Sequence, residues 1–227
     1  LLYSGNSSAR TLTGVGFEPS WVWIKERTST SDHMLFDQPR GVQKYISSNL
    51  TNQEQTSAGM LTAFDSDGFT YSSSGSNAND NTVTYVAWCW RANGGTTATN
   101  SEGNHDCTLQ ANAKAGFSIM TLGNYTSASG VTIGHGLDKA PFFYIHKPLN
   151  SNNWHVYHSG IGATKALLLN TTAAQATAIG YWANTEPTAD VLSLGNTFAG
   201  TGNGIVYAWS EIEGYSKFSS YVGNGNA

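Results

Sequence analysis

The sequence has little charge and few cysteines. Charged residues occupy 11% of the 227 positions, with 11 Lys and Arg against 15 Asp and Glu, and the formal net charge is −4. Such a chain lacks the basic surface that nucleic-acid binding requires, so we expect no nucleic-acid partner. The two cysteines, Cys89 and Cys107, are too few for a disulfide scaffold, and the sequence leaves open whether they form a bridge.

Long hydrophobic runs are missing as well. No stretch approaches the roughly 18 apolar residues of a membrane span, and no signal peptide is visible, so we expect no membrane insertion. Strong helix formers do not recur in periodic runs, which argues against long helices. The first residue is Leu1 rather than Met, which predicts a processed chain or a segment of a longer one.

Small polar residues and aromatic residues are abundant instead. The chain contains 25 Gly, 25 Ser, 25 Thr and 20 Asn, and 12% of its residues are aromatic, including seven Trp. Disordered chains have few aromatic residues, so disorder is excluded. Aromatic and β-branched residues favour strands, while Gly, Asn and Ser favour turns. The composition therefore predicts an all-β protein.

An internal repeat is the strongest pattern in the sequence. Residues 3–91 and 122–210 align with few gaps, which indicates two diverged copies of one unit. The matching landmarks are Gly14-Val15-Gly16-Phe17 with Gly134-His135-Gly136-Leu137, Pro19 with Pro141, Lys25 with Lys147, His33 with His155, Lys44 through Asn49 with Lys165 through Asn170, and Ala87-Trp88 with Ala208-Trp209.

Each copy contains short apolar runs bounded by turn residues, as expected of strands. The predicted strands are Trp21–Lys25, Met34–Asp37, Lys44–Ser48, a hairpin over Phe64–Tyr71 and Thr82–Trp90 in the first copy, and Phe142–Lys147, Trp154–His158, Lys165–Leu169, Val191–Leu194 and Gly204–Ile212 in the second. A strand pair is predicted over Cys107–Leu122, and one or two helical turns over Thr171–Ala176.

Many short strands with regular turns are typical of a β-sandwich or jelly roll. We predict two tandem β-sandwich domains, jelly-roll or lectin-like, over residues 1–92 and 107–227. Residues 93–106, rich in Gly, Thr, Asn and Ser, are predicted to be a linker or long loop. Tyr221 is predicted to begin a third copy.

Metal sites are not predicted. Asp65-Ser66-Asp67-Gly68 resembles the start of a calcium loop, but the late bidentate glutamate is missing, and a hairpin turn is the better interpretation. His155 and His158 would point to opposite faces of a strand, and no Cys or His spacing supplies a zinc site. We expect no metal and no cofactor.

Catalytic motifs are missing too. The sequence has no nucleophile elbow, P-loop or dinucleotide fingerprint. Asp37, Asp65 and Glu211 are the carboxylates that could serve glycoside hydrolysis. However, the acidic residues of the second copy do not repeat the positions of the first. The sequence therefore predicts no catalytic residues and no enzyme.

Sugar binding is the remaining chemical hypothesis. Aromatic rings beside amide and carboxylate side chains form platforms for sugar rings. Trp154, Trp182 and Tyr181 lie at loop edges rather than in the middle of strands, which makes them candidate carbohydrate-binding residues. Large aromatic residues also anchor cores, and the sequence leaves both interpretations open.

Several strings carry a family resemblance. They are Gly16-Phe17-Glu18-Pro19 before Trp21-Val22-Trp23-Ile24-Lys25, Phe64-Asp65-Ser66-Asp67-Gly68-Phe69, Tyr85-Val86-Ala87-Trp88-Cys89-Trp90, and in the second copy Lys165-Ala166-Leu167-Leu168-Leu169-Asn170 and Glu213-Gly214-Tyr215-Ser216-Lys217-Phe218. Together they resemble a repeat domain common in structural proteins of marine tailed phages. The resemblance covers nearly the whole chain and carries over no catalytic residues.

The resemblance implies a phage virion structural protein, of tail-fibre or appendage type, that contacts the host surface. The expected location is the virion surface or the extracellular space. Its expected partners are other virion proteins, copies of itself in a homo-oligomer, and a host-surface glycan. The alternatives are a capsid decoration or head-fibre protein, and a carbohydrate-binding module or glycan-degrading enzyme.

Overall fold

The computed structural model describes residues 1–72, 78–93 and 95–225. The fold over these residues is all-β, as predicted, with several antiparallel sheets and one short 3-10 helix. Position 94 of the predicted linker and the last two residues of the predicted second domain lie outside the described residues.

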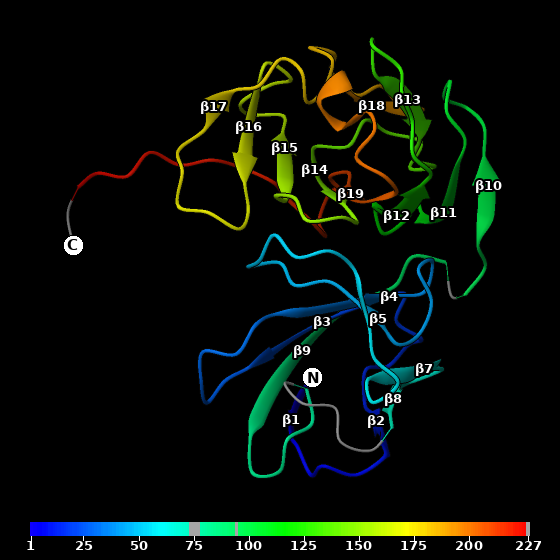
Figure 1. Ribbon diagram of the computed structural model, residues 1–227, viewed down its shortest axis with the longest axis vertical. Helices are drawn as coiled ribbons and strands as arrows, with labels where there is room; N and C mark the ends of the chain where they lie inside the picture. The colour runs from blue at the N-terminus through cyan, green and yellow to red at the C-terminus, as the bar shows by residue number, and fades with distance from the viewer. Residues whose placement is uncertain (73–77, 94, 226–227) are drawn as a thin grey trace.

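The chain forms two halves, one above the other in Figure 1. The strands of the first half are β1 (Leu2–Ser4), β2 (Arg10–Thr13), β3 (Trp21–Glu26), β4 (Met34–Asp37), β5 (Lys44–Tyr45), β6 (Gln55–Thr56), β7 (Leu61–Asp65), β8 (Gly68–Tyr71) and β9 (Thr84–Trp90). The elements of the second half are β10 (Ala98–Asn100), β11 (Cys107–Asn112), β12 (Phe117–Leu122), β13 (Val131–Gly134), β14 (Phe143–Pro148), β15 (His155–His158), β16 (Lys165–Leu168), β17 (Ala176–Thr177), β18 (Val191–Leu194), the 3-10 helix η1 (Asn196–Phe198) and β19 (Gly204–Trp209).

Two sheets enclose the core of each half. In the first half a sheet of order β1-β9-β3-β4 faces a sheet of order β2-β8-β7. In the second half an eight-stranded sheet of order β10-β11-β12-β19-β14-β15-β16-β17 faces the pair β13-β18. Val22 and Ile24 of β3 fill the first core, while Tyr144 of β14 and Val206 of β19 fill the second.

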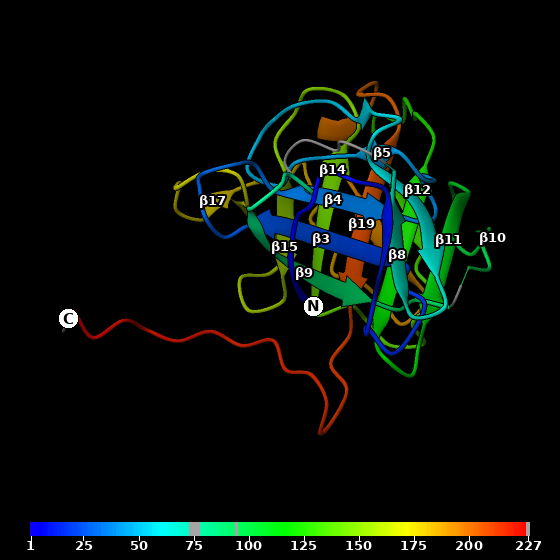
Figure 2. The same ribbon diagram turned by 90° about the horizontal axis from the view of Figure 1, so that it is seen from below.

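A third core lies between the halves. The alternate residues of the same strands point into it, including Trp21 of β3, Ile145 of β14 and Tyr207 of β19. Because successive side chains of a strand point to opposite faces, a strand covered on both faces reads as an unbroken apolar run. In Figure 2 the strands β3, β4 and β9 cross β14 and β19 rather than running along them. The halves are therefore joined through a buried apolar layer.

Some local predictions differ from the structure. Thr171–Ala176 was expected to form helical turns, but this segment is irregular and ends in β17, where Ala176 pairs with Ala166. The expected linker 93–106 contains β10, which pairs with β11. The predicted strand pair over Cys107–Leu122 is confirmed as β11 and β12.

The segment after β19 leaves the body of the molecule, and its last described residues are exposed (Figure 2). Nearer to the body, Lys217 pairs with Glu211 at 2.8 Å, and Phe218 stacks on Phe143 with 5.6 Å between ring centroids. Among the described residues, no helix is long and apolar enough to cross a membrane.

Candidate ligand-binding site

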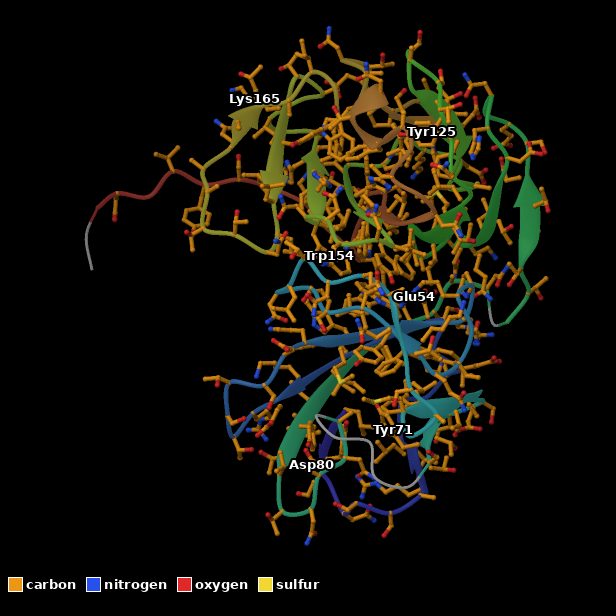
Figure 3. All side chains as sticks on the ribbon, in the orientation of Figure 1. Glu54, Tyr71, Asp80, Tyr125, Trp154 and Lys165 are labelled. Atoms are coloured by element: carbon orange, nitrogen blue, oxygen red, sulfur yellow. The ribbon has the colours of Figure 1, made fainter. Side chains whose placement is uncertain are left out.

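Trp154, the first residue predicted to bind sugar, is completely buried. It lies at the boundary between the halves in Figure 3. Its indole Nε1 donates to the carbonyl oxygens of Ser47, at 2.9 Å, and Leu50, at 3.1 Å, both in the first half. Because no ring face reaches solvent, Trp154 anchors the contact between the halves and offers no platform to a sugar.

Trp182 and Tyr181 also belong to a core. Trp182 is completely buried, and its Nε1 donates to the carbonyl oxygen of Lys165 at 3.0 Å. Tyr181 is half-buried and stacks on Phe198, with 5.4 Å between ring centroids. The structure therefore corrects the prediction for the two tryptophans, because their position at loop edges in the sequence concealed their complete burial.

The three candidate carboxylates lie in separate surroundings. Asp37 is buried between the halves, where Arg40 Nε lies 2.6 Å from Asp37 Oδ2. Asp65, at the end of β7, accepts a hydrogen bond from the Thr70 hydroxyl at 2.7 Å. Glu211 pairs with Lys217 after β19. Each carboxylate thus holds a local structural contact.

The Asp65–Gly68 segment forms the predicted hairpin turn, with Asp65 paired to Gly68. The carboxylate of Asp67 accepts the backbone N–H of Gly14, at 3.0 Å, and of Gly16, at 2.5 Å. These hydrogen bonds hold the pKa of Asp67 below its usual value. Within the part of the chain that the structure describes, no group of three or more His, Cys, Asp or Glu side chains could hold a metal ion.

Both cysteines are free. Burial raises the pKa of the Cys89 thiol to about 11, and burial with the nearby Asp106 and Glu102 raises that of Cys107 to about 12. The thiolate is the reactive form of cysteine. At neutral pH both side chains therefore remain protonated. Cys89 packs against the first core, and the Cys107 thiol donates to the Gly134 carbonyl oxygen at 3.2 Å.

Four tryptophans share one face of the first-half sheet, and we call them the tryptophan face: Trp21 and Trp23 of β3, and Trp88 and Trp90 of β9. The strand register pairs Trp21 with Trp90 and Trp23 with Trp88. Alternate residues of a strand lie on the same side, so the spacing of two within each strand brings all four indoles together.

Exposure changes along the tryptophan face. Trp21 is 1% exposed and packs on Tyr207 in the layer between the halves, with 4.3 Å between ring centroids, whereas Trp88 is 44% exposed. Trp23 and Trp90 are half-buried. The Trp23 indole Nε1 donates to Nδ1 of His33 at 2.7 Å, which fixes the orientation of the ring. The face therefore runs from the interior to the solvent.

A cleft opens where the tryptophan face meets the second half, and we call it the aromatic cleft. Its volume is about 690 Å³, which falls within the usual range for small-molecule sites. Its lining residues are mostly aromatic or aliphatic: Phe17, Trp21, Trp23, Cys89, Trp90, Arg91, Asn112, Ala115, Phe117, Phe143, Ile145, Leu169, Trp209, Tyr215, Ser216 and Phe218. Both halves and the C-terminal segment contribute to it.

One buried donor beside the cleft is unsatisfied. The indole Nε1 of the buried Trp21 has no hydrogen-bond partner among the described residues. Leaving a buried donor unpaired costs about 1–3 kcal/mol. Arg91 is the one charged side chain that lines the cleft within the described residues. The cleft thus offers aromatic ring faces and almost no charge, while the Trp21 Nε1 is itself buried beneath its surface.

The sequence held a signal for this site. Trp21-Val22-Trp23 and Trp88-Cys89-Trp90 both place tryptophan at every second position, which puts both indoles of each strand on one face. Their position inside apolar runs favoured the interpretation as core residues. The second half, which covers Trp21 but leaves Trp88 open, could not be placed from these runs.

Comparison with known proteins gives one match. A family model described as a domain of unknown function (DUF7483) matches residues 1–227. No curated protein and no solved structure shows significant similarity to the chain.

Proposed function

The chain belongs to the DUF7483 family, and we propose that it is a structural protein of a phage virion surface, a tail-fibre or appendage component that helps to contact the host. The proposal starts from the sequence segments of this chain that resemble the repeat domain of marine tailed-phage structural proteins. The observation that carries it is the third core, which joins two sandwich-like halves into one body. A rigid, protease-resistant body suits a virion part that remains outside the cell.

We further propose that the halves are tandem copies of one β-sandwich unit. The order β1-β9-β3-β4 in the first half matches the order β12-β19-β14-β15 in the second. Likewise, the pair β2-β8 in the first half corresponds to the pair β13-β18 in the second. A duplicated unit accounts for both correspondences, because strand order follows from the chain path of the unit.

Matching hydrogen bonds support the same proposal. The His33 N–H donates to the Asn49 side chain, and the Trp154 N–H donates to that of Asn170, across 16 residues in each case. This favours an alignment of His33 with Trp154, one position away from the His155 expected from the sequence. The residue common to both copies is the asparagine. Its side chain holds the backbone directly before β4 in the first half and directly before β15 in the second.

The closing strands support a second shift in the alignment. The Ser20 N–H donates to the Trp90 carbonyl at 2.7 Å, and the Phe142 N–H donates to the Trp209 carbonyl at 2.8 Å. Trp90, rather than Trp88, is then the counterpart of Trp209. The exposed Trp88 then has no matching tryptophan in the second copy.

We propose a non-catalytic role on the virion surface, in contact with other virion proteins and with further copies of this chain. The structural contacts of Asp37, Asp65 and Glu211 support this role. A capsid decoration or head-fibre protein would have the same architecture and differ in its place on the particle. A carbohydrate-binding module is favoured by a separate observation, the tryptophan face.

The experiment is to locate the chain in purified particles. Mass spectrometry of gradient-purified virions should detect it, and immunogold labelling should place it on the tail or an appendage. Labelling over the head would favour the decoration alternative. Failure to detect the chain in particles, when it is present in infected-cell lysate, would overturn the virion proposal.

A further inference from the structure

One edge of β9 is only partly covered by β1. The N–H of Ala87 donates to the Leu1 carbonyl oxygen at 2.8 Å, and the Leu1 amino group donates to the Ala87 carbonyl oxygen at 2.8 Å. Because the bonded residues of an antiparallel strand alternate along it, the N–H and C=O of Cys89 point to the same edge. Among the described residues the pairing with β1 ends at Ala87, so neither of these groups has a strand partner.

The second half shows what covers the equivalent edge. By the alignment of the closing strands, Ala208 of β19 corresponds to Cys89. Ala208 pairs with Ser118 of β12, and the Ser210 N–H donates to the Gly116 carbonyl oxygen at 2.9 Å. An antiparallel strand of the same unit therefore covers β19 at the position where β9 is open.

The open edge of β9 lies beside the aromatic cleft. Cys89 and Arg91, which occupy this edge, both line the cleft. In the second half the covering strand adds an aromatic contact, since Phe117 of β12 packs on Trp209 with 5.1 Å between ring centroids. Unpaired backbone groups of an edge strand are a template for another strand. The site thus favours a peptide strand, with its backbone on this edge and side chains in the cleft.

The C-terminal segment 218–224 resembles β12 and the two residues after it. It begins with Phe-Ser and ends with Gly-Asn, like residues 117–124, and is one residue shorter. Residues 219–223 are exposed and make no hydrogen bond within the described part of the chain. In Figure 2 the segment runs away from the body of its own molecule. It therefore offers an unpaired strand to a neighbouring molecule.

We propose that the C-terminal segment 218–224 of one copy of the chain adds as a strand to the open edge of β9 in a second copy. Backbone hydrogen bonds to Cys89 supply affinity, and side chains packed on Trp90 supply specificity. The inference deepens the proposed contact between copies of the chain and rests on that part of the proposed function. Because the edge and the segment are different surfaces, the contact is heterologous and continues from copy to copy.

The first test is sedimentation velocity of the whole chain over a range of concentrations. We expect self-association that increases with concentration. Ser220→Pro combined with Tyr221→Pro should weaken it by at least about tenfold, because one of two neighbouring prolines must remove a paired N–H. Ser219→Ala is the matched control, since it keeps every backbone N–H and should leave association unchanged. Circular dichroism confirms that each variant is folded.

The second test locates the contact. A synthetic peptide of residues 217–225 is added to the double-proline variant, whose own segment cannot pair, and hydrogen exchange is read by mass spectrometry. We expect slower exchange in the fragment that contains Cys89 and Arg91. The same peptide with both prolines should give no protection. Protection at another sheet edge, such as that of β10, would overturn the proposal.

Two further outcomes decide against strand addition. A chain that remains monomeric at every concentration overturns it. Self-association that the double-proline variant retains unchanged also overturns it, while leaving the broader proposal of contact between copies in place. The location of the chain in the particle is measured separately, so the virion proposal and this inference can each fail alone.

Discussion

Tyr207 of β19 and Asp37 of β4 come from different halves, yet the Tyr207 hydroxyl donates to Asp37 Oδ2 at 2.7 Å. Arg40 completes the group, with its Nε on Asp37 and its Nη2 donating to the Leu35 carbonyl at 2.9 Å. Buried charges are tolerated only when they are paired and hydrogen-bonded. Each member of this group therefore depends on the other two.

Tyr207→Phe should lower the free energy of unfolding by about 1.5–3 kcal/mol, the usual contribution of a hydrogen bond to a charged group. The variant keeps the ring in the layer between the halves and removes only the hydroxyl. Urea denaturation measures the loss. Tyr215→Phe, at an exposed position, should change stability by less than about 0.5 kcal/mol. Equal effects of the two changes would contradict the role of the Asp37 contact.

Two buried histidines make the fold sensitive to acid. Burial, with a smaller effect of the Lys147 charge, lowers the pKa of His155 from 6.5 to about 4. Burial, His155 and Lys147 together lower the pKa of His146 well below 6.5. The folded protein thus favours neutral histidines, while the unfolded chain takes up protons near pH 6.5.

Stability from His155 is therefore complete above pH 6.5 and is lost as the pH falls from 6.5 to about 4. The pKa difference corresponds to about 3 kcal/mol. Urea denaturation across this range should show the decline, and His155→Gln should flatten it. A wild-type stability that is flat from pH 6.5 to 4 would contradict the burial argument.

At the scale of elements, the hairpin of β7 and β8 depends on one glycine. Gly68 has a φ of +156°, and a Cβ at this position would lie 1.8 Å from the carbonyl oxygen of Leu12 on β2. Since that atom is backbone, the sheet would have to shift to admit a side chain. The close approach of β2 and β8 therefore requires glycine.

Gly68→Ala should destabilise the protein by about 2–3 kcal/mol, because steric overlap adds to the strained backbone. Thermal unfolding measures the effect. Gly123→Ala is the matched control, since a Cβ there meets no atom within 4 Å and the backbone φ is not in the left-handed region. A Gly68 variant as stable as the control would show that the β2–β8 contact is looser than described.

The strands were largely predictable because apolar runs and turn residues alternate along the chain. β4 and β18 were predicted with their observed bounds. What each face of a strand covers was not predictable. Trp154 meets Ser47, 107 residues away, and no local pattern contains that information. The same limitation led the sequence to place candidate sugar-binding residues on two indoles that are buried in the structure, Trp154 and Trp182.

At the scale of the whole molecule, the third core makes the two halves one folding unit. Its members come from β3, β4, β12, β14, β15 and β19 and from adjoining loops, so neither half can unfold without exposing apolar surface of the other. Hydrogen exchange read by mass spectrometry during denaturation should therefore give one common midpoint for peptides of both halves. Two separate midpoints would contradict a shared core.

Trp154→Ala tests this coupling. Removing a large buried side chain costs about 3–5 kcal/mol, and the two donated hydrogen bonds are lost with it. We expect the midpoints of both halves to fall together. A fall confined to peptides of the second half would show that Trp154 stabilises only its own half.

The connection between β9 and β10 is a single crossing of the chain, while the layer that joins the halves contains buried residues from both. Cleavage of a peptide bond in this connection would remove the covalent link between the halves but not the buried apolar contacts that hold them together. The two pieces would then behave as complementing fragments, made from separate genes and reassembling without a covalent link. The protein is in this sense an intramolecular heterodimer. The connection between β9 and β10 is therefore a suitable position for inserting a reporter or a cargo protein.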